Sequence, residues 1–230
     1  GAMVTNVFLY KRLGFEPFKD FAPVSIVATA APMMVINPSV AARTVQEFIA
    51  LAKAKPGELN FGSGGVGTTS HIVGEVFKAA TGVNIVHVPY KGQAPALTDL
   101  LGGQVTMMFS TVGTSLPHVR AGKLRVIAVG SDKRTAVYPD APTIAEAGVP
   151  GYASYEWNGV YAPAATPPEI IARLNQAFVS ALKQPAVIAR IGEFNGEIIA
   201  STPQELDTFR RAEIEKWQRV AKEFNLQLSQ

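Results

Sequence analysis

Glycine and hydroxyl residues gather in one short stretch, and their spacing is typical of loops that bind anions. The stretch is NFGSGGVGTTSH, residues 60–71, in which Gly62, Gly64 and Gly67 satisfy the spacing G-x-G-x-x-G. In dinucleotide-binding enzymes, that spacing lets backbone N–H groups approach a pyrophosphate closely. The stretch therefore raises two hypotheses: a dinucleotide-dependent enzyme, or a protein that binds another anion.

The sequence around the glycines does not fit a nucleotide site. The strand expected before them, ELNF at 58–61, is short and polar at its start. A dinucleotide-binding fold carries an acidic residue about 20 positions further on, to bind the ribose. Here that region, residues 86–88, reads Val-His-Val, and the next acid is Asp99. A phosphate-binding P-loop is also excluded, because no lysine follows the last glycine.

The same residues suit a carboxylate. Glycines expose backbone amides, and the unpaired N–H groups at the start of the following helix carry partial positive charge. Thr68, Thr69 and Ser70 add hydroxyl donors there. His71 offers another donor, although a histidine in a first helical turn is as often a packing residue. The alternative interpretation is a tight turn in which Thr68 or Thr69 only caps the helix.

Other site chemistry finds no support in the sequence. Cysteine is absent, which removes thiolate catalysis, disulfides and cysteine-based metal sites. The three histidines are isolated, and no G-x-S-x-G nucleophile motif occurs. Ser70 and His71 are adjacent, so on a helix their side chains point apart. We therefore expect no catalytic residue, no metal and no cofactor.

Strands and short helices alternate along the first part of the chain. Strands are expected at 24–30, 33–38, 58–61, 84–90, 104–110 and 124–130, and helices from 44, 72, 94 and 114. After an irregular, proline-rich stretch at 131–153 with one short helix near 143–147, we expect a strand at 155–163, helices at 167–182 and 185–192, a strand at 197–200 and a last helix from 202. The alternation predicts right-handed βαβ units and a mostly parallel sheet, with ligands bound at the carboxyl ends of its strands.

Composition and the irregular stretch set the domain organisation. We expect two lobes, one complete at 33–154 and one assembled from 4–32 and 155–230; the opening Gly-Ala-Met, 1–3, is typical of a cloning remnant. The net charge is only +3 and the basic residues are scattered, which argues against nucleic acid as a partner. No apolar run reaches the length of a membrane span.

Several segments together resemble one protein family, the substrate-binding proteins of tripartite tricarboxylate transporters, of the Bug or TctC type. The segments are VPYKGQAPALTDLLGGQV (88–105), FAPVSIVATAAPMMVINPS (21–39), NFGSGGVGTTSH (60–71), AGKLRVIAV (121–129) and KRTAVYPDAPTIAEAGVPGY (133–152). The resemblance implies a periplasmic solute receptor with a two-lobe α/β fold of the type II periplasmic-binding-protein kind. It also implies a small carboxylate ligand, a membrane permease as partner, and hinge strands near 33–37 and 155–161.

Carried over by position, the resemblance implies a set of ligand-binding residues in three loops. They are Ser63, Gly64, Gly67, Thr68, Thr69, Ser70 and His71 in the first loop, Tyr90 and Lys91 in the second, and Ser110 and Thr111 in the third. Members of the family often have aspartates at the positions of Thr106 and Ser110. An aspartate can pair with an ammonium group and a serine cannot, so we expect a ligand without an amine: a di- or tricarboxylate or an aromatic acid.

A second departure concerns length. Members of the family begin some 70 residues earlier, so the first lobe is expected to be incomplete at its N-terminus. Its helices at 167–182 and 203–224 would then keep apolar faces partly uncovered, which predicts either self-association or a loosely held first lobe, together with weak ligand binding. An effector-sensing domain of a transcription regulator, with the same two-lobe architecture, is the alternative among binding proteins.

Overall fold

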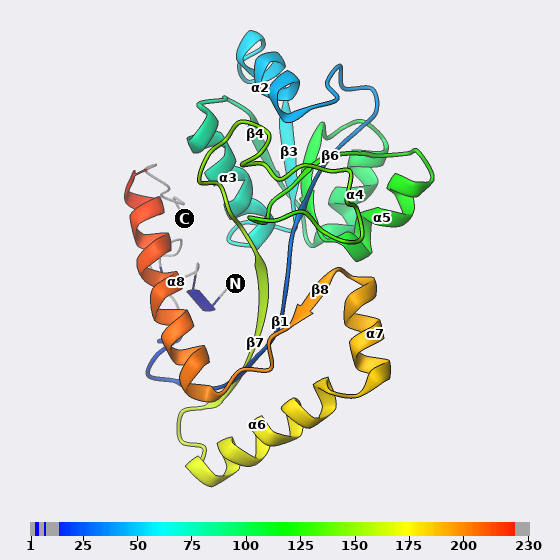
Figure 1. Cartoon of the computed structure of the whole chain (residues 1–230). Helices are drawn as coiled ribbons and strands as arrows, with labels where there is room; N and C mark the ends of the chain where they lie inside the picture. Colours follow the sequence, from blue (N-terminus) through cyan, green and yellow to red (C-terminus); the bar gives the residue numbers. More distant parts are fainter. Residues whose placement is uncertain (1–2, 5–6, 8–13, 224–230) are drawn as a thin grey trace. The chain divides into compact units, whose positions relative to one another are not determined.

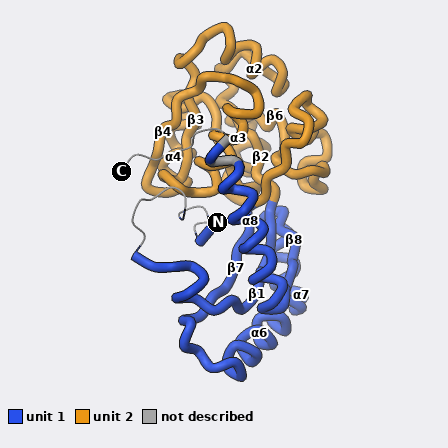
Figure 2. The backbone as a smooth tube through the Cα atoms, turned by 90° about the vertical axis from the view of Figure 1, so that its left-hand side faces the viewer, with its two compact units in different colours: residues 1–30, 156–230 blue, residues 31–155 orange. Residues whose placement is uncertain are grey.

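The computed structural model describes residues 3–4, 7 and 14–223 of the 230-residue chain (Figure 1). The chain divides into two compact units: unit 1 is 1–30 with 156–230, and unit 2 is 31–155 (Figure 2). It passes between them at Ala30–Ala31 and at Tyr155–Glu156. The strands expected to form the hinge therefore do not cross between units, because each one lies wholly inside the sheet of a single unit.

Unit 2 contains a five-stranded sheet in the order β4-β3-β5-β2-β6. Its strands are β2 (Met33–Ile36), β3 (Asn60–Ser63), β4 (Val86–Pro89), β5 (Met107–Ser110) and β6 (Arg125–Val129). β3 pairs in parallel with β4 and β5, whereas β2 pairs antiparallel with β5 and β6. The fold class is confirmed as α/β, and the sheet is mixed, because β2 runs against the other four strands.

A single strand makes the sheet mixed. β3, β4, β5 and β6 all run in the same direction, as the alternation of strands and helices predicts. β2 follows β1 without a helix between them, and it inserts between β5 and β6 in the opposite direction. A pattern of alternating elements identifies crossover units, but it says nothing about where a strand arriving from the other unit will insert.

Helices cover both faces of this sheet (Figure 1). α2 (Val45–Ala54) and α3 (Thr69–Thr81) pack on one face; α4 (Gln93–Leu101) and α5 (Val112–Arg120) pack on the other. Alternate residues of each strand enter the two cores: Met34, Ile36, Met107 and Phe109 face α2 and α3, whereas Met33, Val35 and Met108 face α4 and α5. Burial on both sides explains why β2 and β5 are continuous apolar runs rather than alternating patterns.

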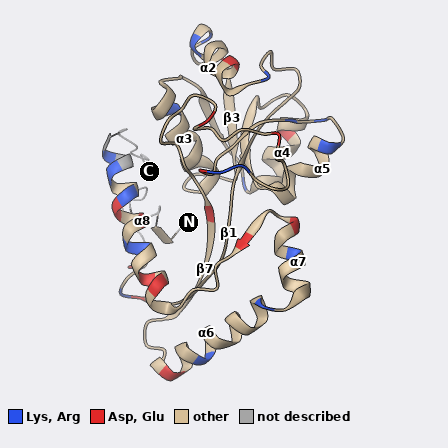
Figure 3. Ribbon diagram, in the orientation of Figure 1, with Lys and Arg blue, Asp and Glu red and all other residues tan. Residues whose placement is uncertain are grey.

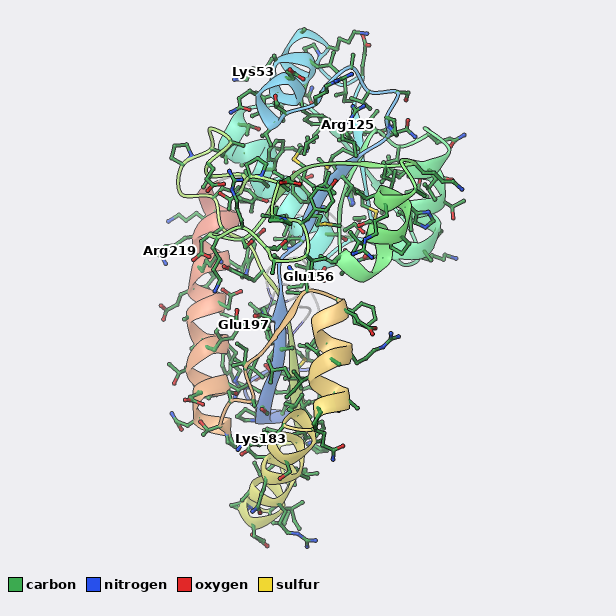
Figure 4. The ribbon with its side chains drawn as sticks, turned by 45° about the vertical axis from the view of Figure 1, so that its right-hand side comes forward. Lys53, Arg125, Glu156, Lys183, Glu197 and Arg219 are labelled. Carbon is green, nitrogen blue, oxygen red and sulfur yellow. The ribbon has the colours of Figure 1, made fainter. Side chains whose placement is uncertain are left out.

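Two local expectations in unit 2 have different outcomes. The helix expected from residue 44 is observed as α2, and Thr44 caps it, since its Oγ1 accepts a hydrogen bond of 3.1 Å from the Glu47 N–H. The helix expected near 143–147 is only one turn, in which the Ala147 N–H donates to the Thr143 carbonyl oxygen. Thr143 also forms a bridge to Val129, so it belongs partly to the sheet. Arg125 ties β6 to the loop before α2 through the Ala42 carbonyl oxygen (Figure 4).

Unit 1 contains a three-stranded antiparallel sheet in the order β7-β1-β8. Its strands are β1 (Phe21–Ala30), β7 (Glu156–Pro163) and β8 (Gly196–Ile198), and its helices are α6 (Pro168–Leu182), α7 (Pro185–Glu193) and α8 (Pro203–Glu223). This sheet has no parallel pair among its described strands. Glu156 and Glu197 lie on its outer strands, opposite Ala30 and Thr29 (Figure 4).

The helices of unit 1 are unequally buried. α8 places Leu206 and Ile214 in a small core with Ile26 and Trp157. α8 also carries basic and acidic residues (Figure 3), paired for example between Asp207 and Arg211. By contrast, α6 buries only Leu182, and none of the nine residues of α7 is buried. Exposed apolar side chains result: Ile170, Ile188, Phe194 and Ile199.

Within residues 3–4, 7 and 14–223, no helix combines the length and the apolar character needed to cross a membrane.

Candidate functional site

The three predicted loops leave the sheet of unit 2 at a single edge. β3, β4 and β5 end at Ser63, Pro89 and Ser110. Ser63 is level with Pro89 on β4, and Gly62 is level with Met108 on β5. Because these strands are parallel, their carboxyl ends and the loops that follow lie side by side. We call this the carboxyl edge.

The helices that follow these strands leave over different faces of the sheet. β3 and β5 are neighbours, yet β3 leads into α3 on one face and β5 into α5 on the other. In open α/β sheets, ligands bind outside the carboxyl ends of strands at such a switch point. The topology therefore favours the space between the loop after Ser63 and the loop after Ser110.

The glycine loop is joined to the loop after β4. The Tyr90 N–H donates to the Ser63 carbonyl oxygen (3.1 Å), and the Gly92 N–H donates to that of Gly64 (3.0 Å). Gly65 has a φ of +126°, and a Cβ there would lie 2.9 Å from the Tyr90 carbonyl oxygen. Only glycine permits both this conformation and this close approach. The first two predicted loops are thus one bonded structure.

Most hydroxyl groups of the loop bond within the loop. Ser70 Oγ accepts from the Gly64 N–H and Ser63 Oγ accepts from the Gly65 N–H, both at 3.1 Å. Thr68 Oγ1 donates to the Gly65 carbonyl oxygen at 2.7 Å. Ser63 and Ser70 are buried, and Thr68 is partly exposed. These side chains fix the shape of the loop.

His71 lies beneath the loop, where it accepts a hydrogen bond. The Gly67 N–H donates to His71 Nδ1 at 3.2 Å, and the His71 side chain is buried. Its ring stacks on the ring of His87, with centroids 4.0 Å apart, and His87 stacks in turn on Phe61 at 4.8 Å. His87 Nε2 lies 2.6 Å from Ser63 Oγ.

Both rings are held in the neutral form. Burial, and secondarily the charge of Lys78, lowers the pKa of His71 to about 4. Burial, followed by His71 and Lys78, lowers the pKa of His87 to about 3. A neutral His71 that accepts at Nδ1 carries its proton on Nε2. The two histidines therefore act as uncharged hydrogen-bonding groups.

A glycine in α3 permits this stack. A Cβ added to Gly74 would lie 2.2 Å from a ring carbon of Phe61, which is fully buried. Without that Cβ, α3 approaches β3 closely enough for His71 to reach His87 on β4. Gly74 therefore sets the position of the N-terminus of α3 relative to the strands.

The N-terminus of α3 is open. Its N-cap is Thr68, whose side chain makes no capping bond, and its first turn contains no acidic residue. The same is true of α4 after Gly92 and of α5 after Thr111. Three helices thus begin at the carboxyl edge with uncapped amides, which carry partial positive charge. Thr69, the first residue of α3, is partly exposed there.

The remaining predicted residues differ in what they offer. Tyr90 donates its hydroxyl to Asp99 Oδ2 at 2.6 Å, and burial, followed by this bond, raises its pKa to about 12. Lys91 beside it is exposed. Ser110 is fully buried and its hydroxyl donates to the Thr111 carbonyl oxygen. Thr111 is partly exposed, with its hydroxyl 2.7 Å from that of Thr114.

Thr106 lies away from the carboxyl edge. It precedes β5, where its N–H donates to Asn60 Oδ1 and its hydroxyl accepts from the Asn60 N–H. Among the described residues, no group of three His, Asp or Glu side chains is placed to hold a metal ion.

The sequence did not reveal the role of His87, which it indicates only as a core residue. The alternation of side chains along a strand is the signal that could have found this role, because side chains two apart share a face. In the observed register, Phe61 is opposite His87, so Phe61, Ser63 and His87 share one face of the sheet. That register is a tertiary property, and it cannot be read from residues 60–71 alone.

Solved structures of other proteins resemble this chain closely. Rpa4515 of R. palustris, solved with adipate, is 37% identical with a TM-score of 0.93, over 98% of this chain and 75% of that one. MatC of Rhodopseudomonas palustris, with bound malate, is 29% identical with a TM-score of 0.89, over 95% and 75%. The periplasmic binding protein BugD is 28% identical with a TM-score of 0.93, over 98% and 76%.

The family is established from sequence over nearly the whole length. The chain spans 68% and 69% of two curated relatives that it matches. The family and its solved members are periplasmic solute-binding proteins rather than enzymes. The pattern that defines the family described as "Tripartite tricarboxylate transporter family receptor" matches residues 1–226, and the chain belongs to that family.

Proposed function

We propose that this protein captures a small carboxylate without an amino group in the periplasm and delivers it to the membrane permease of a tripartite tricarboxylate transporter. One observation carries the proposal: α3, α4 and α5 all begin at the carboxyl edge without a side-chain cap and without an acidic residue in the first turn. Helix N-termini of this kind bind anions through backbone N–H groups and the helix dipole.

The charges around these helices agree with an anionic ligand. Lys91 lies exposed just before α4, and the carboxylate closest to it in sequence, Asp99, is engaged by Tyr90. Figure 3 shows acidic residues on α8 and at other sites of both units. A carboxylate at the carboxyl edge would therefore meet donors and a lysine, with no acid in the first turns of α3, α4 and α5.

The hydrogen bonds divide the proposed ligand-binding residues into two groups. One group shapes the loop: Ser63, Gly64, Gly67, Thr68, Ser70 and His71. The other group is left to meet the ligand: Thr69 with the first-turn amides of α3, then Lys91 and Thr111 at the starts of α4 and α5. Tyr90 and Ser110 support the second group, because their hydroxyls are already donated to Asp99 and Thr111.

The absence of an amine in the ligand rests on Ser110. This residue offers a buried, uncharged hydroxyl where an ammonium group would need a carboxylate partner. The two related structures with named ligands hold adipate and malate, neither of which has an amino group. Dicarboxylates of four to six carbons are therefore the first ligands to test.

A thermal-shift screen on the purified chain tests this function. The panel contains adipate, malate, aspartate, NAD and ATP, because a ligand that binds only the folded state raises the melting temperature by mass action. We expect adipate, malate or both to raise it. A ligand at 100 times its Kd adds about 2.7 kcal/mol to the free energy of unfolding. A shift with aspartate alone would refute the exclusion of amines, and a shift with NAD or ATP alone would refute the carboxylate function.

A further inference from the structure

We propose that His71 and His87 are positioning residues for carboxylate binding: they act as neutral hydrogen-bonding groups that hold the glycine loop in its anion-accepting shape. The inference rests on the proposed function, and it assigns to His71 a different role from that of a direct donor to the ligand.

His71 already uses one ring nitrogen in a hydrogen bond to the glycine loop. His71 Nδ1 accepts from the Gly67 N–H, and the ring is buried beneath the loop. A histidine that reaches the loop through its acceptor nitrogen cannot use that nitrogen to donate to a carboxylate. Nδ1 can therefore contribute to binding only through the loop, by fixing the peptide that leads into the first turn of α3.

His87 contacts the other end of the glycine loop. His87 Nε2 lies 2.6 Å from Ser63 Oγ, and that hydroxyl also accepts from the Gly65 N–H. The loop is thus fastened at its start through Ser63 and at its end through Gly67. The two fastening groups contact each other, because their rings are stacked.

The rings beneath the glycine loop are packed against one another. Phe61, His87 and His71 form a continuous stack that spans β3, β4 and α3, and Gly74 allows the close packing. A binding loop gains affinity when its bound shape is held in advance, because less conformational entropy is lost on binding. The lowered pKa values of both rings agree with this role, since a protonated Nδ1 would not accept from Gly67.

Four matched variants separate hydrogen bonding from packing. His71→Asn keeps an acceptor near the place of Nδ1 and loses the ring, whereas His71→Phe keeps the ring and loses the acceptor. His87→Gln and His87→Phe form the corresponding pair for Nε2. Adipate and malate are titrated into each variant by calorimetry, and the melting temperature of each variant reports whether it is folded.

We expect His71→Phe and His87→Phe to weaken binding about tenfold, as the loss of one net hydrogen bond implies, while His71→Asn and His87→Gln stay within about twofold of the wild type. The proposal is overturned if the phenylalanine variants bind as the wild type does. It is also overturned if the asparagine and glutamine variants lose as much affinity as the phenylalanine variants.

A second measurement needs no ligand. Hydrogen exchange of the Gly67 amide, followed by NMR, reports the bond to His71 directly. The amide should stay protected in His71→Asn and exchange faster in His71→Phe; equal exchange in both would refute the positioning role. If the wild type binds neither dicarboxylate, the proposed function fails, and this exchange experiment still decides whether the histidines fasten the loop.

Discussion

Helix N-termini differ between the two edges of the sheet in unit 2. One is the carboxyl edge; the other, where β3, β4 and β5 begin, we call the amino edge. α2 begins beyond the amino edge, after Ile36, and its first turn is closed by its own residues: Thr44 Oγ1 accepts from the Glu47 N–H, and Glu47 Oε2 accepts from the Arg43 N–H. At the carboxyl edge, α3, α4 and α5 have neither a capping side chain nor an acid in the first turn.

Other polar groups at the amino edge are also hydrogen-bonded within the protein. Asn37 donates to the Leu100 carbonyl oxygen and accepts from the Ser39 N–H, and Thr106 is bonded to Asn60. In unit 1, α8 repeats the closed arrangement, with Thr202 and Glu205 bonded reciprocally. This chain therefore can cap helices, and the open N-termini of unit 2 all lie at the carboxyl edge. In unit 1, α7 also begins without a side-chain cap or an acid in its first turn, so an open N-terminus does not by itself identify a binding site. The contrast between the two edges of unit 2 supports the proposal that a ligand is the partner at the carboxyl edge.

The largest effect is expected when an acidic residue is introduced in the first turn of α3. In Thr69→Asp, the new carboxylate would occupy the first-turn amides and repel a carboxylate ligand, while it favours the helix dipole. We expect the affinity for the dicarboxylate selected by the thermal-shift screen to fall about 100-fold, which is about 2.7 kcal/mol. The melting temperature without ligand should not decrease. Calorimetry with the purified variant measures the first effect and a thermal melt the second.

Thr69→Asn is the matched control, because it has the shape of aspartate without the charge. A much smaller loss of affinity is expected for this variant. If Thr69→Asp binds as tightly as the wild type, the N-terminus of α3 does not contact the ligand, and the open helix ends require another explanation.

The second change concerns the packing that places the open helix. In Gly74→Ala, the added Cβ would meet the ring of Phe61 at 2.2 Å, and that ring is buried and stacked on His87. Overpacking of a core costs typically 1–3 kcal/mol, so we expect a net loss of about 2 kcal/mol in the free energy of unfolding, measured with urea. Gly192→Ala in α7 is the control, because no atom lies within 4 Å of its Cβ position. Equal stability of the two variants would contradict the close approach of α3.

The closed helix ends could be predicted from sequence, and most of the carboxyl edge could not. Thr44 with Glu47 is a local signal three residues apart, and such capping boxes specify a helix start without reference to the rest of the fold. The glycine loop also carries a local signal, because its glycines and hydroxyls are adjacent, and that signal predicts an anion site. By contrast, the role of His87 depends on the register between β3 and β4, and the place of β2 depends on an insertion between distant strands.

The same limit explains the residues whose roles changed. The sequence indicates Ser70 and His71 as groups near an anion, and the family resemblance adds Ser63. Neither could show that the polar atoms of these residues are bonded to the loop itself. The family resemblance singles out Thr106 together with Ser110 in the strand expected at 104–110, yet Thr106 lies before β5, at the opposite edge from Ser110. Which end of a strand a residue occupies decides whether it can reach a ligand, and short strands make that boundary hard to predict.

The smallest effect is expected when the capping side chain of α2 is removed. Thr44→Ala removes the oxygen that accepts from the Glu47 N–H, so we expect a loss of about 1 kcal/mol in the free energy of unfolding. Affinity for the dicarboxylate should remain unchanged, because α2 begins at the amino edge and Thr44 holds no part of the glycine loop. Urea denaturation and calorimetry on the same preparation measure both quantities. A parallel fall in affinity would mean that the two edges are coupled through the sheet, and the contrast between a structural edge and a binding edge would then have to be given up.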